Sequence, residues 1–490
     1  MPLQNVNGWS KLNIYPLQSG EYAARPGLRR IHTPDAGRKF VGGFSVMNSY
    51  TGEVWHYLFD VVSASTSGLR LRIVDDDFVT WQEFLLGVNV DPRAITHAIV
   101  EGEIIISSPD FDTLWGLIGS GIIYAKKVAS DNPATTAIDI PRGICTSWCN
   151  RVVIANGASL FFSDPISATG GSTRTFVGQS QNQRPAPIFG VHEGANGMLV
   201  VLTSRGAYGL DSSAAAVGIV GSNGTPWQIL NHHETYTYES SAVIRGRCYA
   251  LSRAGYLLVD IENDKEEALD DVMAPRAYGP RISCGDYRSA KLLAGDEGPY
   301  VSYGDALSAH ALADGLRSWW TCSYNSSFRV RATLRTPDGG EMLLAEDGVY
   351  LLGGNVDGGQ LLSSEAATQP KAVMSGIVDM DPAANPTVRE ITYGAAVGGA
   401  GSIYAAVRGD AQSAIPPADT RSLVIGTSSW GATGVIYQSA PMASRRLQFD
   451  LNGDDVSIEV AADYPETRLH VAAAVEFSKS APNRPNDRGN

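Results

Sequence analysis

Short runs of apolar residues, paired across polar turns that contain glycine, recur along most of the chain. The pairing is clearest in RVVIANGASLFFSDP, MLVVLTSRGAYGLDS, RCYALSRAGYLLVDI and GPYVSYGDALSAHAL, whose turns lie at Gly157, Gly206, Gly255 and Gly304. Successive turns are 49 residues apart in this stretch. Two apolar runs joined by a short glycine turn are typical of a β-hairpin, so the pattern predicts hairpins at a regular spacing.

The same pattern continues on both sides of these four copies. EMLLAEDGVYLLGG turns at Gly348, while ITHAIVEGEIIISSPD and SVMNSYTGEVWHYLFD turn at Gly102 and Gly52. Several copies close on an aspartate (Asp60, Asp110, Asp164, Asp211 and Asp260). A lone hairpin cannot bury its faces, whereas repeated units of four short strands and about 50 residues are typical of a β-propeller. The sequence therefore predicts an all-β fold, with a β-propeller of six or seven blades over residues 35–360.

A different pattern begins near residue 365. Apolar and polar residues alternate in RRLQFDLN, VSIEVA and HVAAAVEF, which is the pattern of strands with one buried face. With AVMSGIVDM, VREITYGAAV and SIYAAVR, they supply seven or eight strands and predict a C-terminal β-sandwich over residues 365–479. The polar residues 480–490 predict a flexible tail.

Composition agrees with a chain of strands and turns. The 490 residues include 52 glycines and 25 prolines, and only 18% are charged. Five cysteines spread over this length argue against a disulfide framework and for reduced thiols. The N-terminal residues contain no apolar signal region, and no run of about 18 uncharged apolar residues occurs. We expect a soluble protein that folds in a cytoplasm and does not insert into membranes.

Charge is distributed unevenly along the chain. The formal net charge is −13, yet the first 40 residues carry six basic residues against Glu21 and Asp35, a local charge of +4 that leaves −17 for the rest. The six are Lys11, Arg25, Arg29, Arg30, Arg38 and Lys39. A chain this acidic is a poor nonspecific DNA binder, because phosphate contacts need a positive face. Residues 1–34 are therefore interpreted as a basic N-terminal arm.

The sequence contains no signature of catalysis or of a cofactor. GxSxG, HExxH and phosphate loops ending in GK[ST] do not occur. Possible metal ligands lie in ICTSWCN, LNHHETY, the run from Asp75 to Asp77 and DLNGDDVSIE, but none has the spacing of a metal site. Scattered tryptophans such as Trp115 and Trp148 fit packing between blades better than a sugar-binding channel. We expect no enzyme activity, no cofactor and no metal.

The N-terminal stretch resembles a known family. Asn13-Ile14-Tyr15-Pro16, a short polar spacer and Arg25-Pro26-Gly27-Leu28 resemble the opening of the tail nozzle or tail-hub proteins of short-tailed bacteriophages, also called packaged-DNA stabilisation proteins. FGVHEGANGMLVVLTSRGAYGLD, TPWQIL and SSAVIRGRCYALSRAGYLLVD are similar to that family as well, and so is a C-terminal β-domain that ends in RLHVAAAVEF.

The resemblance implies a structural virion protein. Members of this family form a ring, usually of six subunits, beneath the portal and adaptor proteins and above tail-tip, knob, needle or fibre proteins. The lumen of the ring conducts double-stranded DNA during ejection and holds packaged DNA beforehand. We therefore expect a homo-hexamer in the virion tail, assembled in the host cytoplasm.

The basic N-terminal residues are a candidate surface for docking to an acidic partner ring. The candidates are Arg25, Arg29, Arg30 and Arg38, selected because their charge contrasts with the rest of the chain. These arginines could instead merely cover the first blade. Two other functions stay open at this point: a propeller enzyme or carbohydrate-binding module that acts on a glycan, and a receptor-binding tail protein. A stable ring would favour the nozzle, whereas a monomer that turns over glycans would favour the enzyme.

Overall fold

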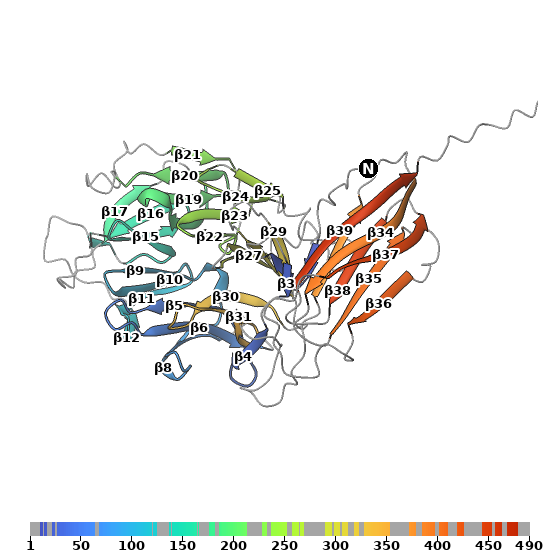
Figure 1. The fold of residues 1–490 in the computed structure, drawn as a ribbon. Helices are drawn as coiled ribbons and strands as arrows, with labels where there is room; N and C mark the ends of the chain where they lie inside the picture. Colours follow the sequence, from blue (N-terminus) through green and yellow to red (C-terminus); the bar gives the residue numbers. More distant parts are fainter. Residues whose placement is uncertain are drawn as a thin grey trace, which may run out of the picture.

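The computed structural model consists of strands joined by turns and loops (Figure 1). Its described residues contain no α-helix and two short 3₁₀-helices, Pro92–Ala94 and Ala195–Gly197. Between 27 and 352 the structure describes all residues except 64–67, 120, 125–136, 139, 164, 166–175, 182–185, 213–227, 233–236, 252–256, 264, 269–289, 296–297, 304–305, 312–317 and 323–327. Outside that range it describes the backbone of strands between residues 10 and 24 and between 372 and 478. The predicted tail, 480–490, lies outside the described residues.

The first two sheets each contain four antiparallel strands in chain order. Sheet 1 consists of β5 (Arg38–Met47), β6 (Val54–Val62), β7 (Leu69–Val74) and β8 (Thr80–Gly87). Sheet 2 consists of β9 (Thr96–Val100), β10 (Glu103–Ser108), β11 (Phe111–Leu117) and β12 (Gly121–Tyr124). Each strand pairs with the next along the chain, so each sheet is a simple meander.

The next three sheets repeat this order. Sheet 3 consists of β14 (Ile144–Trp148), β15 (Arg151–Asn156), β16 (Ser159–Ser163) and β17 (Phe176–Gln181), with β13 (Ala137–Ile138) added at its edge. Sheet 4 consists of β18 (Ile188–Glu193), β19 (Leu199–Thr203), β20 (Gly206–Leu210) and β21 (Gln228–Asn231). Sheet 5 consists of β22 (Ser241–Ile244), β23 (Arg247–Leu251), β24 (Leu257–Asp260) and β25 (Lys265–Ala268).

The last two groups of strands differ in how they are completed. Sheet 6 consists of β26 (Lys291–Ala294), β27 (Pro299–Tyr303), β28 (Ala306–Ala311) and β29 (Ser318–Cys322), and continues into a larger sheet. Sheet 7 consists of β30 (Val330–Arg335), β31 (Glu341–Ala345), β32 (Gly348–Leu352) and the N-terminal strand β4 (Leu28–His32). A strand from near the N-terminus therefore completes the sheet that β30, β31 and β32 begin.

Glycine turns lie between paired strands, as the sequence predicts, but not always between the same two. Gly157, Gly206 and Gly348 lie at the junction of the second and third strands of their sheets. Gly52 and Gly102 instead lie between the first and second strands of sheets 1 and 2. The longer interval between Gly102 and Gly157 arises from this change of hairpin. The turns at Gly255 and Gly304 lie outside the described residues.

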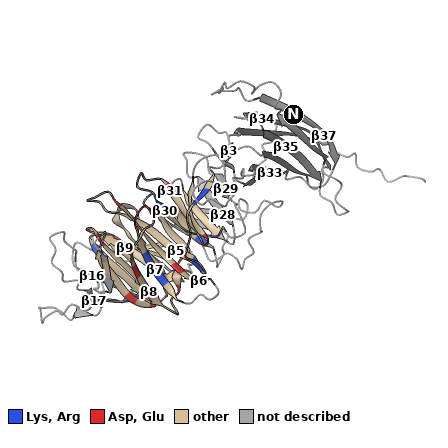
Figure 2. Cartoon of the chain, turned by 90° about the horizontal axis from the view of Figure 1, so that it is seen from below, with Lys and Arg blue, Asp and Glu red and all other residues tan. Residues whose placement is uncertain are grey.

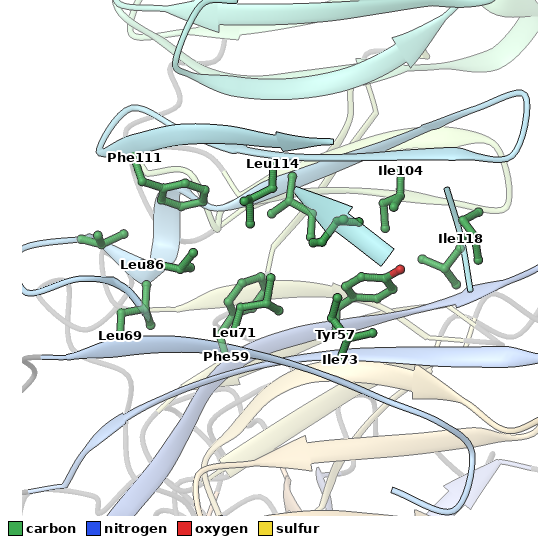
Figure 3. Packing of buried hydrophobic residues seen from close by; sticks show 14 of the residues in the cluster. Tyr57, Phe59, Leu69, Leu71, Ile73, Leu86, Ile104, Phe111, Leu114 and Ile118 are labelled. Carbon is green, nitrogen blue, oxygen red and sulfur yellow. The ribbon is translucent and has the colours of Figure 1, made fainter. Parts of the chain in front are cut away.

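Apolar side chains fill the space between successive sheets because the inner strands bury both faces. On β15, Val153 packs toward sheet 4, whereas the adjacent Val152 and Ile154 pack toward sheet 2. Figure 3 shows the contact of sheets 1 and 2, where Tyr57, Phe59 and Leu71 face residues such as Ile104, Phe111 and Leu114. Strands buried on both faces need continuous apolar runs, which explains the repeated apolar blocks in the sequence.

Similar apolar contacts join the later sheets to one another and join the last sheet to the first. Clusters join sheet 4 to sheet 5, sheet 6 to sheet 7, and sheet 7 to sheet 1. Between sheets 5 and 6, the Lys291 ammonium lies 2.8 Å from the Glu239 carboxylate, and the Leu292 amide donates to the Glu239 carbonyl. The described sheets therefore close on themselves.

The C-terminal strands form two further antiparallel groups. These strands are β33 (Ala372–Val378), β34 (Asn385–Ala396), β35 (Gly401–Gly409), β36 (Asp419–Ile425), β37 (Ala443–Asn452), β38 (Val456–Ala462) and β39 (Arg468–Ser478). One group has the order β33-β38-β35-β36 and the other β39-β34-β37. They make up the orange and red part of Figure 1.

Short N-terminal strands join this part to the sheets described above. β1 (Ser10–Leu12) lies between β29 of sheet 6 and β33. β2 (Ile14–Pro16) pairs with β3 (Tyr22–Ala24), and β3 pairs with β39. The first 32 residues thus hydrogen-bond to both parts of the chain. No described segment forms a helix of the length and apolar character needed to span a bilayer.

Candidate functional site

The connection from β4 to β5 forms a joint between the last and the first sheet. A pocket of about 510 Å³ opens there, lined by Thr33 to Lys39 of this connection together with Ser63, Arg329, Glu346 and Asp347. Backbone hydrogen bonds fix the joint on both sides: the Phe40 amide donates to the Glu346 carbonyl, and the Ser63 amide donates to the Gly37 carbonyl. We call this region the closing joint.

At the closing joint, the carboxylate of a buried aspartate contacts three arginines. Asp60 on β6 is 0% exposed, and its carboxylate accepts hydrogen bonds from Arg38 and from Arg70, whose Nη2 lies 2.9 Å away. Arg72 Nε lies 3.2 Å from the same carboxylate. Arg38 also donates from Nη2 to the carbonyl oxygens of Asp60 and Gly68. Figure 2 shows that β5 to β8 carry both acidic and basic positions.

Asp35 extends this cluster to the surface. Its carboxylate lies 2.5 Å from Arg70 and 3.1 Å from Arg72. The hydrogen bond from Arg70 holds the pKa of Asp35 below its usual range. Burial alone would lower the pKa of Arg70, but the hydrogen bonds to Asp60 and Asp35 outweigh it and raise that pKa. These two shifts keep Asp35 and Arg70 ionised at neutral pH. The cluster joins the closing connection to β6 and β7.

On the other side of the joint, charged side chains link β4 and β5 to sheet 7. Arg30 lies 3.7 Å from the Asp347 carboxylate, and Lys39 lies 3.7 Å from the Glu346 carboxylate. The Arg30 side chain runs so close to Gly348 that a Cβ at that position would lie 2.6 Å from Arg30 Cδ. A Cβ there would also lie 2.7 Å from the His32 carbonyl oxygen, so only glycine fits where β4 pairs with the start of β32. Arg329 is an exposed cation on the pocket rim.

An aromatic stack connects β4 to the hairpin between β7 and β8. The Phe78 ring lies between the imidazoles of His32 and His56, at centroid distances of 4.8 and 5.0 Å and nearly parallel to both. Phe78 adopts φ of +62°, a left-handed conformation that is unfavourable for a bulky residue. Burial lowers the pKa of both histidines to about 4, so the rings are neutral at neutral pH. The stack fastens the closing strand to sheet 1.

The four arginines predicted as docking residues have different positions. Arg25 lies outside the described residues. Arg38 is engaged by Asp60, and Arg30 lies beside Asp347. Arg29, on β4, pairs with Leu351 of β32 and is partly exposed. Because neighbouring side chains on a strand alternate between faces, Arg29 and Arg30 are directed to opposite faces of sheet 7. The structure thus brings Arg30 and Arg38 to one joint and gives Arg38 an internal role.

The joint also contains residues that sequence reasoning missed. In the sequence, Asp60 is only one of several aspartates that close a repeat, and Asp35 enters only the charge count. The charge pattern itself held the clue, since Arg70 and Arg72 alternate in LRLRIV and so share one face of a strand. What the sequence could not supply is the register that places Asp60 opposite Arg70.

The other side chains considered for chemistry take structural positions. Cys145 is buried on β14, whereas Cys149 lies in the turn that follows β14. The run from Asp75 to Asp77 forms the turn between β7 and β8, where the Asp75 carboxylate accepts from the Val79 amide. Trp148 is fully buried between sheets 3 and 4 and donates to the Gly197 carbonyl. Within the described residues, no group of three His, Cys, Asp or Glu side chains is placed to hold a metal ion.

Comparison with known proteins finds similarity of fold only. No protein-family profile matches the chain, and no curated protein matches it. A streptogramin B lyase structure matches 66% of this chain and 97% of its own at 12% identity, with a TM-score of 0.40. The extracellular domain of a hybrid two component system from B. thetaiotaomicron matches 94% of this chain and 60% of its own at 8% identity, with a TM-score of 0.45. YCF48 from Cyanidioschyzon merolae matches 70% and 98% at 12% identity, with a TM-score of 0.35. Similarities of this size assign no function.

Proposed function

We propose that this chain is a structural subunit of a short bacteriophage tail, a nozzle or hub that forms a ring below the portal and adaptor proteins. One observation carries the proposal: the course of the N-terminal segment. Its family-like residues Ile14-Tyr15-Pro16 form β2, which pairs with β3 and through it meets the C-terminal strand β39. Leu28 begins β4, which completes sheet 7. A segment that ties both parts of the chain together suits a rigid structural component.

In this proposal the seven meander sheets are the seven blades of a β-propeller, and the two C-terminal groups of strands form a β-sandwich. The return of apolar packing from sheet 7 to sheet 1 supports the blade count. Closure by β4 also supports it, because a propeller whose last blade takes a strand from the N-terminus is held closed by ladder hydrogen bonds. Neither part needs a catalytic residue, a cofactor or membrane insertion for this role.

Six copies would form the ring in the virion tail, assembled in the host cytoplasm, with tail-tip, knob, needle or fibre proteins below. Double-stranded DNA would pass through the lumen during ejection and be retained there beforehand. The net charge of −13 supports a conduit that does not grip DNA, because like charges repel phosphate. The chain in this role acts by shape and charge rather than by catalysis.

Arg29 and Arg30 on β4 are the docking residues that we propose for an acidic partner ring. Arg38 is removed from this set because Asp60 and the carbonyl oxygens of Asp60 and Gly68 occupy its guanidinium. Arg29 is directed to the face of sheet 7 opposite to that of Arg30, so the proposed contact surrounds the edge of this sheet.

The test is capture of the full chain by phage tails or adaptor rings that lack it. We expect the double variant Arg29→Glu and Arg30→Glu to bind at least tenfold more weakly than wild type. The matched control reverses two exposed arginines elsewhere, Arg93 and Arg142, which pair with Asp91 and Asp112. Wild-type binding by the first variant would remove the docking assignment, and failure of the unmodified chain to join any tail would remove the proposed function.

A further inference from the structure

Exposed large apolar side chains are concentrated in one sector of the described structure. Nine such side chains are exposed among the described residues, and eight of them lie between residues 47 and 117, in sheets 1 and 2 and the turns beside their strands. The eight are Met47, Tyr50, Val79, Trp81, Leu85, Val88, Ile99 and Leu117, with exposed fractions from 39% to 78%. The ninth, Ile229, lies on β21 of sheet 4. We call the eight residues the apolar sector.

One half of the apolar sector follows the outer strand of sheet 1. On β8, the exposed Trp81, Glu83 and Leu85 alternate with the more buried Gln82, Phe84 and Leu86, and Thr80 at the start of the strand is exposed as well. Val79 and Val88 extend this row beyond the two ends of the strand. No described strand hydrogen-bonds to the outer edge of β8. An edge strand of eight residues with apolar side chains is a site where protein chains associate.

The other half is held at the tip of the hairpin between β5 and β6. The Asn48 side chain accepts a hydrogen bond from the Tyr50 amide and donates one to the Ile118 carbonyl at the end of β11. The Tyr50 ring lies over Gly102, where a Cβ would be 3.2 Å from it. These contacts place Tyr50, which is 78% exposed, beside the strand end that carries Leu117. The apolar tip is therefore fixed before any partner binds.

The size of the apolar sector favours burial in a permanent interface. The exposed area of eight such side chains is on the order of the 800 Å² that each partner contributes to a stable interface. Interfaces between identical subunits are also more apolar than those of transient complexes. Glu83, the one charged residue in the exposed row on β8, is paired with Arg70 at 3.3 Å. The sector therefore presents a mostly apolar surface whose central charge has a partner.

We propose that the apolar sector is the contact of this chain with a second copy of itself. The choice of a second copy rests on the proposed function, since a ring of identical subunits needs an extensive lateral contact. In that ring, β8 and the Tyr50 hairpin of one copy would be covered by its neighbour.

The experiment measures the mass of the full chain by mass photometry over a dilution series. Wild type is expected to be oligomeric, and Leu85→Glu is expected to raise the dissociation concentration at least a hundredfold. The control is Ile229→Glu, which places the same charge at an exposed large apolar residue outside the sector; among the described residues it is the one such position, and it is 50% exposed. We expect the control to match wild type. Because Leu85 is 69% exposed, this substitution leaves the core intact, and equal thermal unfolding of both variants verifies it.

A monomeric wild type, or a Leu85→Glu oligomer as stable as wild type, would overturn the inference. The outcomes also separate the two proposals. A hexameric ring that survives Leu85→Glu rejects the self-contact but not the tail function. An oligomer that depends on Leu85 but neither forms a ring nor joins tails keeps the self-contact and rejects the tail function.

Discussion

At the scale of single residues, Asp60 is the most buried charged residue that the structure describes. Its carboxylate is fully buried, accepts hydrogen bonds from Arg38 and Arg70, and forms an ion pair with Arg72. A buried carboxylate among three guanidiniums is stable only while its charge remains, because the arginines would otherwise repel one another in a poorly solvated space. We therefore assign Asp60 a structural role, which is to hold the three arginines together at the closing joint.

Replacement of Asp60 by asparagine tests this role. The substitution keeps the shape of the side chain but removes its charge, and breaking a buried ion cluster of this kind costs about 3–5 kcal/mol. We expect the free energy of unfolding in urea to fall by that amount, or the soluble yield to collapse. Asp112→Asn is the control, because Asp112 is exposed beside Arg142 and such pairs contribute less than about 1 kcal/mol. Equal stability of the two variants would show that Asp60 has no special role.

The N-terminal arginines show why residue roles were only partly predictable. The sequence identified a local excess of positive charge, and two of its arginines do lie at the closing joint. Whether an arginine faces a partner or a buried carboxylate depends on strand register, however, and Arg38 meets a carboxylate 22 residues away. Sequence alone gives the charge of such a group but not its neighbour.

At the scale of elements, closure depends on β4 and on the hairpin that stacks against it. β4 forms ladder hydrogen bonds with β32, while Phe78 joins His32 on β4 to His56 on β6. The repeated hairpins were predictable because apolar runs and glycine turns are local signals. The last strand of sheet 7 was not, since it comes from the opposite end of the chain and β4 resembles any other short strand.

The substitution Phe78→Gly changes stability in two opposite ways, through the backbone of the turn and through the aromatic stack. The sign of the net change shows which of the two is larger. Glycine relieves the left-handed conformation at φ of +62°, which by itself stabilises by up to about 1 kcal/mol. Loss of a ring stacked on two imidazoles costs more, because each aromatic pair contributes about 0.5–1.5 kcal/mol in addition to its burial. We therefore expect a net loss of about 1–3 kcal/mol in thermal or urea unfolding.

The matched control is Glu101→Gly, in an exposed hairpin turn with φ of +49° and no ring to lose. It should leave stability unchanged or raise it slightly. If Phe78→Gly were as stabilising as Glu101→Gly, the stack would not hold the closing strand.

At the scale of the whole molecule, the main result is that the meander sheets pack one on the next and that sheet 7 packs on sheet 1. The continuous apolar runs that define the repeat are buried on both faces, as β15 shows with Val153 on one side and Val152 and Ile154 on the other. The sequence could predict the all-β class from this pattern. It could not predict the phase of the repeat, because Gly52 and Gly102 occupy a different hairpin from Gly157. Nor could it indicate that β1 to β3 extend the C-terminal sheets.

In the proposed assembly, the closing joint between sheets 7 and 1 holds each subunit closed, and the apolar sector on sheets 1 and 2 contacts the neighbouring copy. The most direct test is to image the purified full-length chain by negative-stain electron microscopy and to determine the symmetry of its class averages. We predict a ring of six copies around an open lumen. A monomer at every concentration, or an oligomer without a central lumen, would contradict the proposal that this chain forms the conduit of a phage tail.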